Sequence, residues 1–195
     1  INLNAMLIMF TCFIVAGWSA LMKAANSMAL GTFLSATTLM LFANFNHVWI
    51  IVLAIVCFSI GEMLASPKSS EYLGNIAPQQ KKAMYLGFSQ LPLGIGWVLE
   101  GYFGQVLYAN FGSKDTIARQ SLMEGGMPQL QVDAVPIGEA FQRLVEATGM
   151  SADALTAQLY ATNNVGSAWY IMSTVGIVAA AGLYAYGCWT YKLKD

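Results

Sequence analysis

One carboxylate, that of Glu62, interrupts an otherwise apolar run from Val48 to Ser66. The run is long enough to cross a bilayer, because a hydrocarbon core about 30 Å thick needs roughly 20 helical residues. A charge at that depth is costly unless it faces protein or water, takes up a proton or meets a cation. Because desolvation favours the protonated carboxyl group and a neighbouring cation favours the carboxylate, cation binding and protonation are linked there. Glu62 is therefore a candidate for proton-coupled binding; a protonated structural residue, bonded to backbone or to Ser59, is the alternative.

Other polar side chains lie inside apolar stretches. Gln90 could line a cavity or form an interhelical hydrogen bond. Glu100 could face the cavity or reach the outer interface. Near the N-terminus, Asn2 and Asn4 could line the cavity or cap the first helix.

Three residues are candidate hinges. Gly94 and Gly96 follow Gln90 in the same stretch, where glycines favour close helix packing and could also permit the bending that alternating access needs. Pro67 lies at the end of the run that contains Glu62, where it could kink the helix rather than end it and let Lys68 pair with Glu71.

The composition indicates an integral membrane protein. Of 195 residues, 57% are hydrophobic and 10% are charged, against roughly 25% charged residues in soluble domains. The net charge of -1 argues against a nucleic-acid partner, which would require a basic patch. The widely spaced cysteines lack a CxxC pattern, and no metal or cofactor is expected. An enzyme is not expected either, because HExxH, GxSxG and paired-Asp motifs do not occur in the spans.

Five segments are long and apolar enough to span a bilayer. Cytoplasmic connections collect Lys and Arg, and the cations of the short connections lie at Lys23, around Lys81 and after the last span. The first and third connections and the C-terminus are therefore predicted to be cytoplasmic, and the protein to be a multi-pass protein of the inner (plasma) membrane. The predicted segments are four spans within 1–108 (3–22, 28–45, 48–66 and 83–108), an outer loop at 109–166, a last span at 167–191 and a tail at 192–195.

The long connection 109–166 is polar and net acidic, and it contains two predicted helices. The first covers 137–147, where Phe141, Leu144 and Val145 share one face. The second begins at Ser151, a favourable N-cap, and continues through Leu159. We expect a small extramembrane cap without a catalytic constellation.

A series of motifs runs from Gly61 to Gly96: Gly61-Glu62, Ser66-Pro67, Ala77-Pro78, then Tyr85-Leu86-Gly87-Phe88 with Gly94 and Gly96. This series resembles the tenth and eleventh helices of the proton-dependent oligopeptide transporters, which belong to the major facilitator superfamily. Residues 1–5 are similar to the eighth helix, and 29–31 to the opening of the ninth. Two features depart from the family pattern: the polar segment 68–71 replaces apolar residues, and Glu100 is an additional acid.

The resemblance implies an all-α membrane protein whose five transmembrane helices correspond to helices 8–12 of the facilitator fold, with a short helical extramembrane loop. Glu62 would face the central cavity, contact the amino group of a substrate or take part in proton coupling, and Ser66, Gln90 and Glu100 are the further candidate site residues. The implied function is proton-coupled transport of a small solute, such as a di- or tripeptide, by alternating access. The expected partners are the proton, the lipid bilayer and the N-terminal half of a longer polypeptide. The alternative is a non-transporting subunit that keeps the facilitator-like fold and packs against other membrane proteins.

Overall fold

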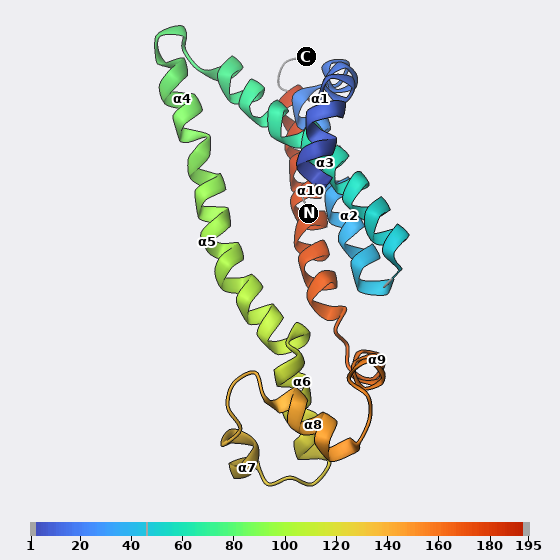
Figure 1. Ribbon diagram of the computed structural model, residues 1–195. Coiled ribbons are helices and arrows are strands. Elements are labelled where there is room, and N and C mark those ends of the chain that lie inside the picture. Colours follow the sequence, from blue (N-terminus) through green and yellow to red (C-terminus); the bar gives the residue numbers. More distant parts are fainter. Residues whose placement is uncertain (1–2, 46, 193–195) are drawn as a thin grey trace. The chain divides into compact units, whose positions relative to one another are not determined.

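The computed structural model describes residues 3–45 and 47–192, and within them the regular secondary structure is helical, without β-strands. Asn2, one of the candidate cavity residues, lies outside the described residues. The chain divides into two compact units, each described by itself. The first unit contains the residues up to Trp97 and those from Trp169 onward, and the second runs from Val98 to Ala168 (Figure 1).

Four helices are long and apolar enough to cross a membrane. They coincide with four of the five predicted spans, and their apolar side chains account for most of the large hydrophobic groups that the chain leaves exposed. The four are α1 (Leu3–Ala20), α2 (Ala24–Asn44), α3 (Val48–Ile76) and α10 (Ser167–Lys192).

Helix α3 continues through Pro67 and ends at Ile76, well beyond the predicted end of the span at Ser66. The Nζ atom of Lys68 lies 2.8 Å from a carboxylate oxygen of Glu71, which confirms the predicted pair. The helix stops where Ala77 takes an extended conformation, because the proline that follows disfavours the helical conformation at the preceding residue.

The predicted span 83–108 is divided locally at Ser89, because Pro92 has no N–H to donate to the carbonyl oxygen of Phe88. Ser89 itself keeps a helical conformation, and its N–H donates to the carbonyl oxygen of Tyr85 at 3.0 Å. The resulting elements are the 3₁₀ turn η1 (Gln79–Lys81), α4 (Lys82–Phe88), α5 (Gln90–Leu107) and the π-helical turn η2 (Tyr108–Gly112).

Small residues bring α2 and α3 into close contact. A Cβ atom added at Gly31 would lie 2.5 Å from the carbonyl oxygen of Gly61, and one added at Gly61 would lie 2.6 Å from the carbonyl oxygen of Gly31. The buried hydroxyl of Ser27 donates to the carbonyl oxygen of Leu64 at 2.9 Å. Such small-residue contacts with interhelical hydrogen bonds are typical of helices that pack within a membrane.

The contact between α2 and α10 has the same character. A Cβ atom on Gly176 would lie 2.6 Å from the Cβ of Ala36, and one on Gly187 would lie 2.9 Å from that of Ala25. The buried Ser173 hydroxyl donates to the carbonyl oxygen of Ala36 at 2.7 Å. Helix α2 is therefore held on two sides by close backbone approaches.

The second unit has a core of larger aliphatic side chains. Its helices include α8, where Leu144 is buried while Phe141 and Val145 pack partly buried against the core, which confirms the predicted face. The Ser151 hydroxyl accepts a hydrogen bond from the N–H of Ala154, which confirms the predicted N-cap. The elements are α6 (Lys114–Glu124), α7 (Gln129–Asp133), α8 (Ala140–Thr148) and α9 (Ala152–Thr162), around the buried residues Ile117, Ala118, Leu122, Val132, Ala140, Leu144, Leu155 and Leu159.

An ion pair on α6 joins the parts of this unit. The Nε of Arg119 donates to Asp115 at 2.8 Å, and its terminal nitrogens donate to backbone carbonyls of the segment 132–136. The other carboxylate oxygen of Asp115 accepts from the N–H groups of Gly138 and Ala140 at 3.1 and 3.0 Å. Partial burial raises the pKa of Asp115, but the hydrogen bonds from Arg119, Ala140 and Gly138 outweigh it, so the pKa of Asp115 lies below its ordinary value.

Candidate functional site

The carboxylate of Glu62 meets an amide from a distant part of the chain. The Nδ2 of Asn4, in the first turn of α1, donates to Oε2 of Glu62 on α3 at 3.2 Å. The hydroxyl of Ser59 donates to the Oδ1 of the same amide at 2.6 Å. Ser59 and Glu62 are three residues apart and so share one face of α3. Asn4 therefore bridges both side chains and ties α1 to α3.

The Ser59 end of this network is buried, and the Glu62 end is partly exposed. Ser59 is 1% exposed, whereas Asn4 and Glu62 are only partly buried. The Ser59 hydroxyl also lies 2.7 Å from the carbonyl oxygen of Ile55, so its single hydrogen has two acceptors within reach. The hydroxyl anchors the amide, and the carboxylate is the end that a solute or proton could reach.

The hydrogen-bonding capacity of Glu62 is only partly used. Within residues 3–45 and 47–192, the Asn4 amide is the one hydrogen-bond partner of this carboxylate, and it bonds Oε2. An amide N–H can only donate, so Oε2 remains the acceptor whether or not the group is charged. A proton or an ammonium group can therefore bind at Oε1 while the bond from Asn4 stays in place.

An apolar groove of about 190 Å³ runs beside this network between α1 and α3. Ser59 belongs to both, while Glu62 does not line the groove. The Thr11 hydroxyl faces it but is satisfied by the carbonyl oxygen of Leu7 at 2.7 Å, and it lies 3.6 Å from the sulfur of Met63. The groove offers space for an apolar group next to the polar cluster.

The other candidate site residues form no hydrogen bond with this cluster among the described residues, although Ser66 follows Glu62 by one turn of α3. Ser66 is exposed on α3, and Gln90 is exposed at the start of α5, where its amide donates to the Ser89 hydroxyl at 3.2 Å. In the described part of the chain, no hydrogen bond joins either residue to Glu62. Glu100 is exposed on α5 within the second unit.

The candidate hinge residues lie in unbroken helices. Pro67 is inside α3, and Gly94 and Gly96 are inside α5. A Cβ atom added at Gly94 or Gly96 would meet nothing within 4 Å among the described residues, so no close contact at either glycine is formed with this part of the chain. The interruption of the helix lies instead at Ser89.

Sequence reasoning did not identify Asn4 as the partner of Glu62. The sequence shows only that Asn4 is a polar residue in the first turn of an apolar span. This left two interpretations open, lining of a cavity and capping of the first helix. Capping is not what Asn4 provides, because its side chain reaches across to α3. Among residues 3–45 and 47–192, no three His, Cys, Asp or Glu side chains lie close enough together to hold a metal ion.

No protein-family model, curated protein or solved structure matches this chain.

Proposed function

We propose that this chain is the major part of the C-terminal half of a proton-coupled secondary transporter of the major facilitator type. Four helices with the length and hydropathy of membrane spans support this proposal, as does the motif series from Gly61 to Gly96. On this proposal the chain is embedded in the inner (plasma) membrane and works together with an N-terminal half.

The observation that carries the proposal is the cluster of Asn4, Ser59 and Glu62. A carboxylate in an apolar helix is costly, and this one keeps an oxygen that no described side chain bonds. Glu62 is only partly buried, so this oxygen lies at the accessible end of the cluster. The spare acceptor is suited to a transported proton or to the ammonium group of a small solute, such as a di- or tripeptide.

The helix ends support the proposed orientation. At one end, Nζ of Lys23 lies 4.1 Å from the ring centroid of Tyr191, and the hydroxyls of Tyr72 and Tyr186 are 2.7 Å apart. The first contact joins the connection between α1 and α2, which contains Lys23, to the end of α10. The second contact joins the C-terminal halves of α3 and α10, which contain Lys68 and Lys192. Because cytoplasmic ends collect such cations, we propose that this end faces the cytoplasm and that the segment 109–166 lies outside.

Uptake by the full-length protein in proteoliposomes tests the proposal. With a proton gradient imposed, Glu62→Gln should reduce solute uptake by about 30-fold or more, because losing a desolvated charge partner costs roughly 2–5 kcal/mol. Glu146→Gln, which removes an exposed acid from α8, is the matched control and should transport normally. Asn4→Leu should also impair uptake, because the carboxylate loses its orienting donor. Unchanged gradient-driven uptake by Glu62→Gln would show that Glu62 has no coupling role.

The surface of α5 favours a second candidate, a non-transporting subunit of a membrane complex. None of the described residues of α5 is buried. Large apolar side chains are exposed along it, among them Ile95, Trp97 and Val98 at 61%, 66% and 73%. Such a surface suits contact with other membrane helices. A complex with fixed stoichiometry, purified from native membranes and inactive in proton-driven uptake, would favour this candidate over the transporter.

A further inference from the structure

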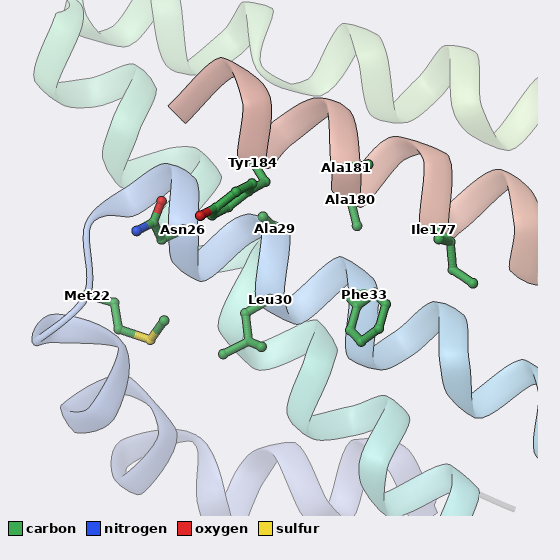
Figure 2. Close-up of a pocket in the computed structure, with 9 residues that line it drawn as sticks. All are labelled: Met22, Asn26, Ala29, Leu30, Phe33, Ile177, Ala180, Ala181 and Tyr184. Atoms are coloured by element: carbon green, nitrogen blue, oxygen red, sulfur yellow. The ribbon is translucent and has the colours of Figure 1, made fainter. Parts of the chain in front are cut away.

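A larger pocket, of about 440 Å³, lies between α2 and α10 in the first unit (Figure 2). Its size is within the roughly 300–1,000 Å³ of small-molecule sites. Leu30 and Phe33 of α2 and Ile177 and Ala181 of α10 are among the lining residues, so most of the wall is hydrocarbon. Leu30 and Phe33 are 47% and 48% exposed, so the pocket is an open groove rather than a sealed cavity.

The groove surface is almost wholly apolar, but two residues with polar groups lie toward one end, next to Met22. Asn26 and Tyr184 line this end, and Figure 2 shows the hydroxyl of Tyr184 pointing toward Asn26. The apolar side chains lie farther along both helices. A ligand that fills the groove would therefore have a long hydrocarbon part and a polar group at one end.

Two lysines lie beyond this end of the groove, although neither is among its lining residues. Lys23, three residues before Asn26, places Nζ 4.1 Å from the ring centroid of Tyr191. Tyr191 lies seven residues after Tyr184, and so on the same face of α10. Lys192 follows in the last turn. Neither α2 nor the described length of α10 contains Asp or Glu, so the positive charge at this end has no acidic partner on either helix.

Aromatic side chains mark the same end as a membrane interface. The Tyr72 and Tyr186 hydroxyls meet at 2.7 Å, and the rings of Tyr186 and Trp189 are 6.3 Å apart. Trp189 is 62% exposed. Tyr and Trp gather at the depth of lipid headgroups, so this end of the groove lies where a phosphate would lie.

We propose that the groove between α2 and α10 binds one anionic phospholipid. An acyl chain lies along Leu30, Phe33, Ile177 and Ala181, and the phosphate lies at Lys23. Apolar burial holds the chain, while the lysine selects negative headgroups. The proposal requires that the helices lie in a bilayer, but it does not depend on transport.

Photocrosslinking of the full-length protein in lipid nanodiscs tests this site. The probe is phosphatidylglycerol with a diazirine on its acyl chain, doped into phosphatidylcholine. The wild-type protein should be labelled on α2 and α10, and phosphatidylcholine with the same diazirine should label it less. Lys23→Gln should lower phosphatidylglycerol labelling by roughly fivefold and bring it to the phosphatidylcholine level. Lys82→Gln removes a cation from α4, outside the groove, and should not change the labelling.

A second pair of variants separates the groove from the general membrane surface. Ala181→Phe fills the groove and should abolish labelling by both lipids. Ala179→Phe places the same side chain at an exposed position of α10 that does not line the groove, and should label as the wild type does. Retention of the circular dichroism spectrum shows that each variant folds.

Several outcomes would overturn the proposal. Equal labelling of the Ala181→Phe and Ala179→Phe variants would mean that lipid does not occupy the groove. Wild-type labelling confined to other helices would mean that another protein segment covers it. If Lys23→Gln leaves labelling by phosphatidylglycerol unchanged, the site does not select an anionic headgroup.

The lipid site and the proposed transport function are tested separately. Loss of proton-driven uptake without any change in labelling would concern transport alone and would leave the lipid site in place.

Discussion

The two units of this chain pack their helices differently, although the first also buries Val15, Met63 and Leu64 as a small apolar cluster. In the first unit, glycine, alanine and serine face one another across α2, α3 and α10, and large apolar side chains such as Phe13 and Leu21 are 84% and 88% exposed. In the second, leucine, isoleucine and valine are buried, and more than half of the chain's charged side chains lie in this unit. Small-residue contacts suit helices in lipid, where apolar surface gains nothing by burial, whereas aliphatic burial stabilises a fold in water. The packing of the first unit is thus the kind that suits lipid, and the core of the second is the kind that suits water.

The sharpest test of this comparison is truncation of an aliphatic side chain in the second unit. Leu144→Ala removes a side chain that is 6% exposed, and should lower the free energy of unfolding of this unit by about 2–5 kcal/mol. Leu130, 86% exposed, provides the matched control, and Leu130→Ala should change stability by less than about 0.5 kcal/mol. Hydrogen exchange of the full-length protein, read separately on peptides from each unit, measures both. Equal effects of the two variants would show that the second unit has no water-excluding core.

Acid should unfold the second unit before the first. Because the pKa of Asp115 is lowered in the folded state, its contribution to stability is present above the ordinary value of about 3.9 and is lost as the pH falls through the folded pKa. Protection of the second unit from hydrogen exchange, taken relative to the intrinsic exchange rate at each pH, should therefore fall below about pH 4, with less change in the first. Asp115→Ala should remove part of this pH dependence and cost roughly 1.5–3 kcal/mol at neutral pH. If the stability of Asp115→Ala depends on pH as that of the wild type does, other carboxylates cause the acid sensitivity.

In the first unit, adding a methyl group should be more harmful than removing one. A Cβ on Gly61 would lie 2.6 Å from the carbonyl oxygen of Gly31 and 2.9 Å from the backbone nitrogen of Ser35. Because backbone atoms cannot move aside cheaply, Gly61→Ala should cost about 1–3 kcal/mol. Gly96→Ala meets nothing within 4 Å and should be neutral or stabilising, since alanine favours helix by up to about 1 kcal/mol. Thermal unfolding in detergent micelles compares the two, and a Gly61→Ala variant as stable as Gly96→Ala would contradict the close helix contact.

Much of the helical framework follows from local sequence. Apolar length located four of the spans, and the Ser151 N-cap and the face of Leu144 were confirmed because capping and periodicity act within a few residues. The same kind of signal was present at Ser113, whose hydroxyl accepts from the N–H of Thr116 and begins α6, but that helix was not predicted. Pro92 indicated that the span 83–108 could bend, but its position alone did not fix the local division at Ser89.

Contacts between distant segments were beyond sequence reasoning. The bond between Asn4 and Glu62 joins residues 58 positions apart, and helical periodicity fixes neither the rotation nor the register of one helix against another. The same limit applies to Gly31 and Gly61, because a small residue becomes a close contact only when its neighbour lies opposite. Glu62 itself stood out because the energetic cost of a carboxylate in an apolar helix is a local property.

The smallest predicted effect concerns a hydrogen bond between helices. The Ser173 hydroxyl donates to the carbonyl oxygen of Ala36 at 2.7 Å, and both residues are buried. Ser173→Ala should cost about 0.6 kcal/mol, because interhelical hydrogen bonds in membrane proteins average near that value. Ser70→Ala, at an exposed position of α3, is the control in the same thermal unfolding measurement. A loss of several kcal/mol at Ser173 would mean that polar bonds hold α2 to α10, and that small-residue contact contributes less than the comparison of the two units implies.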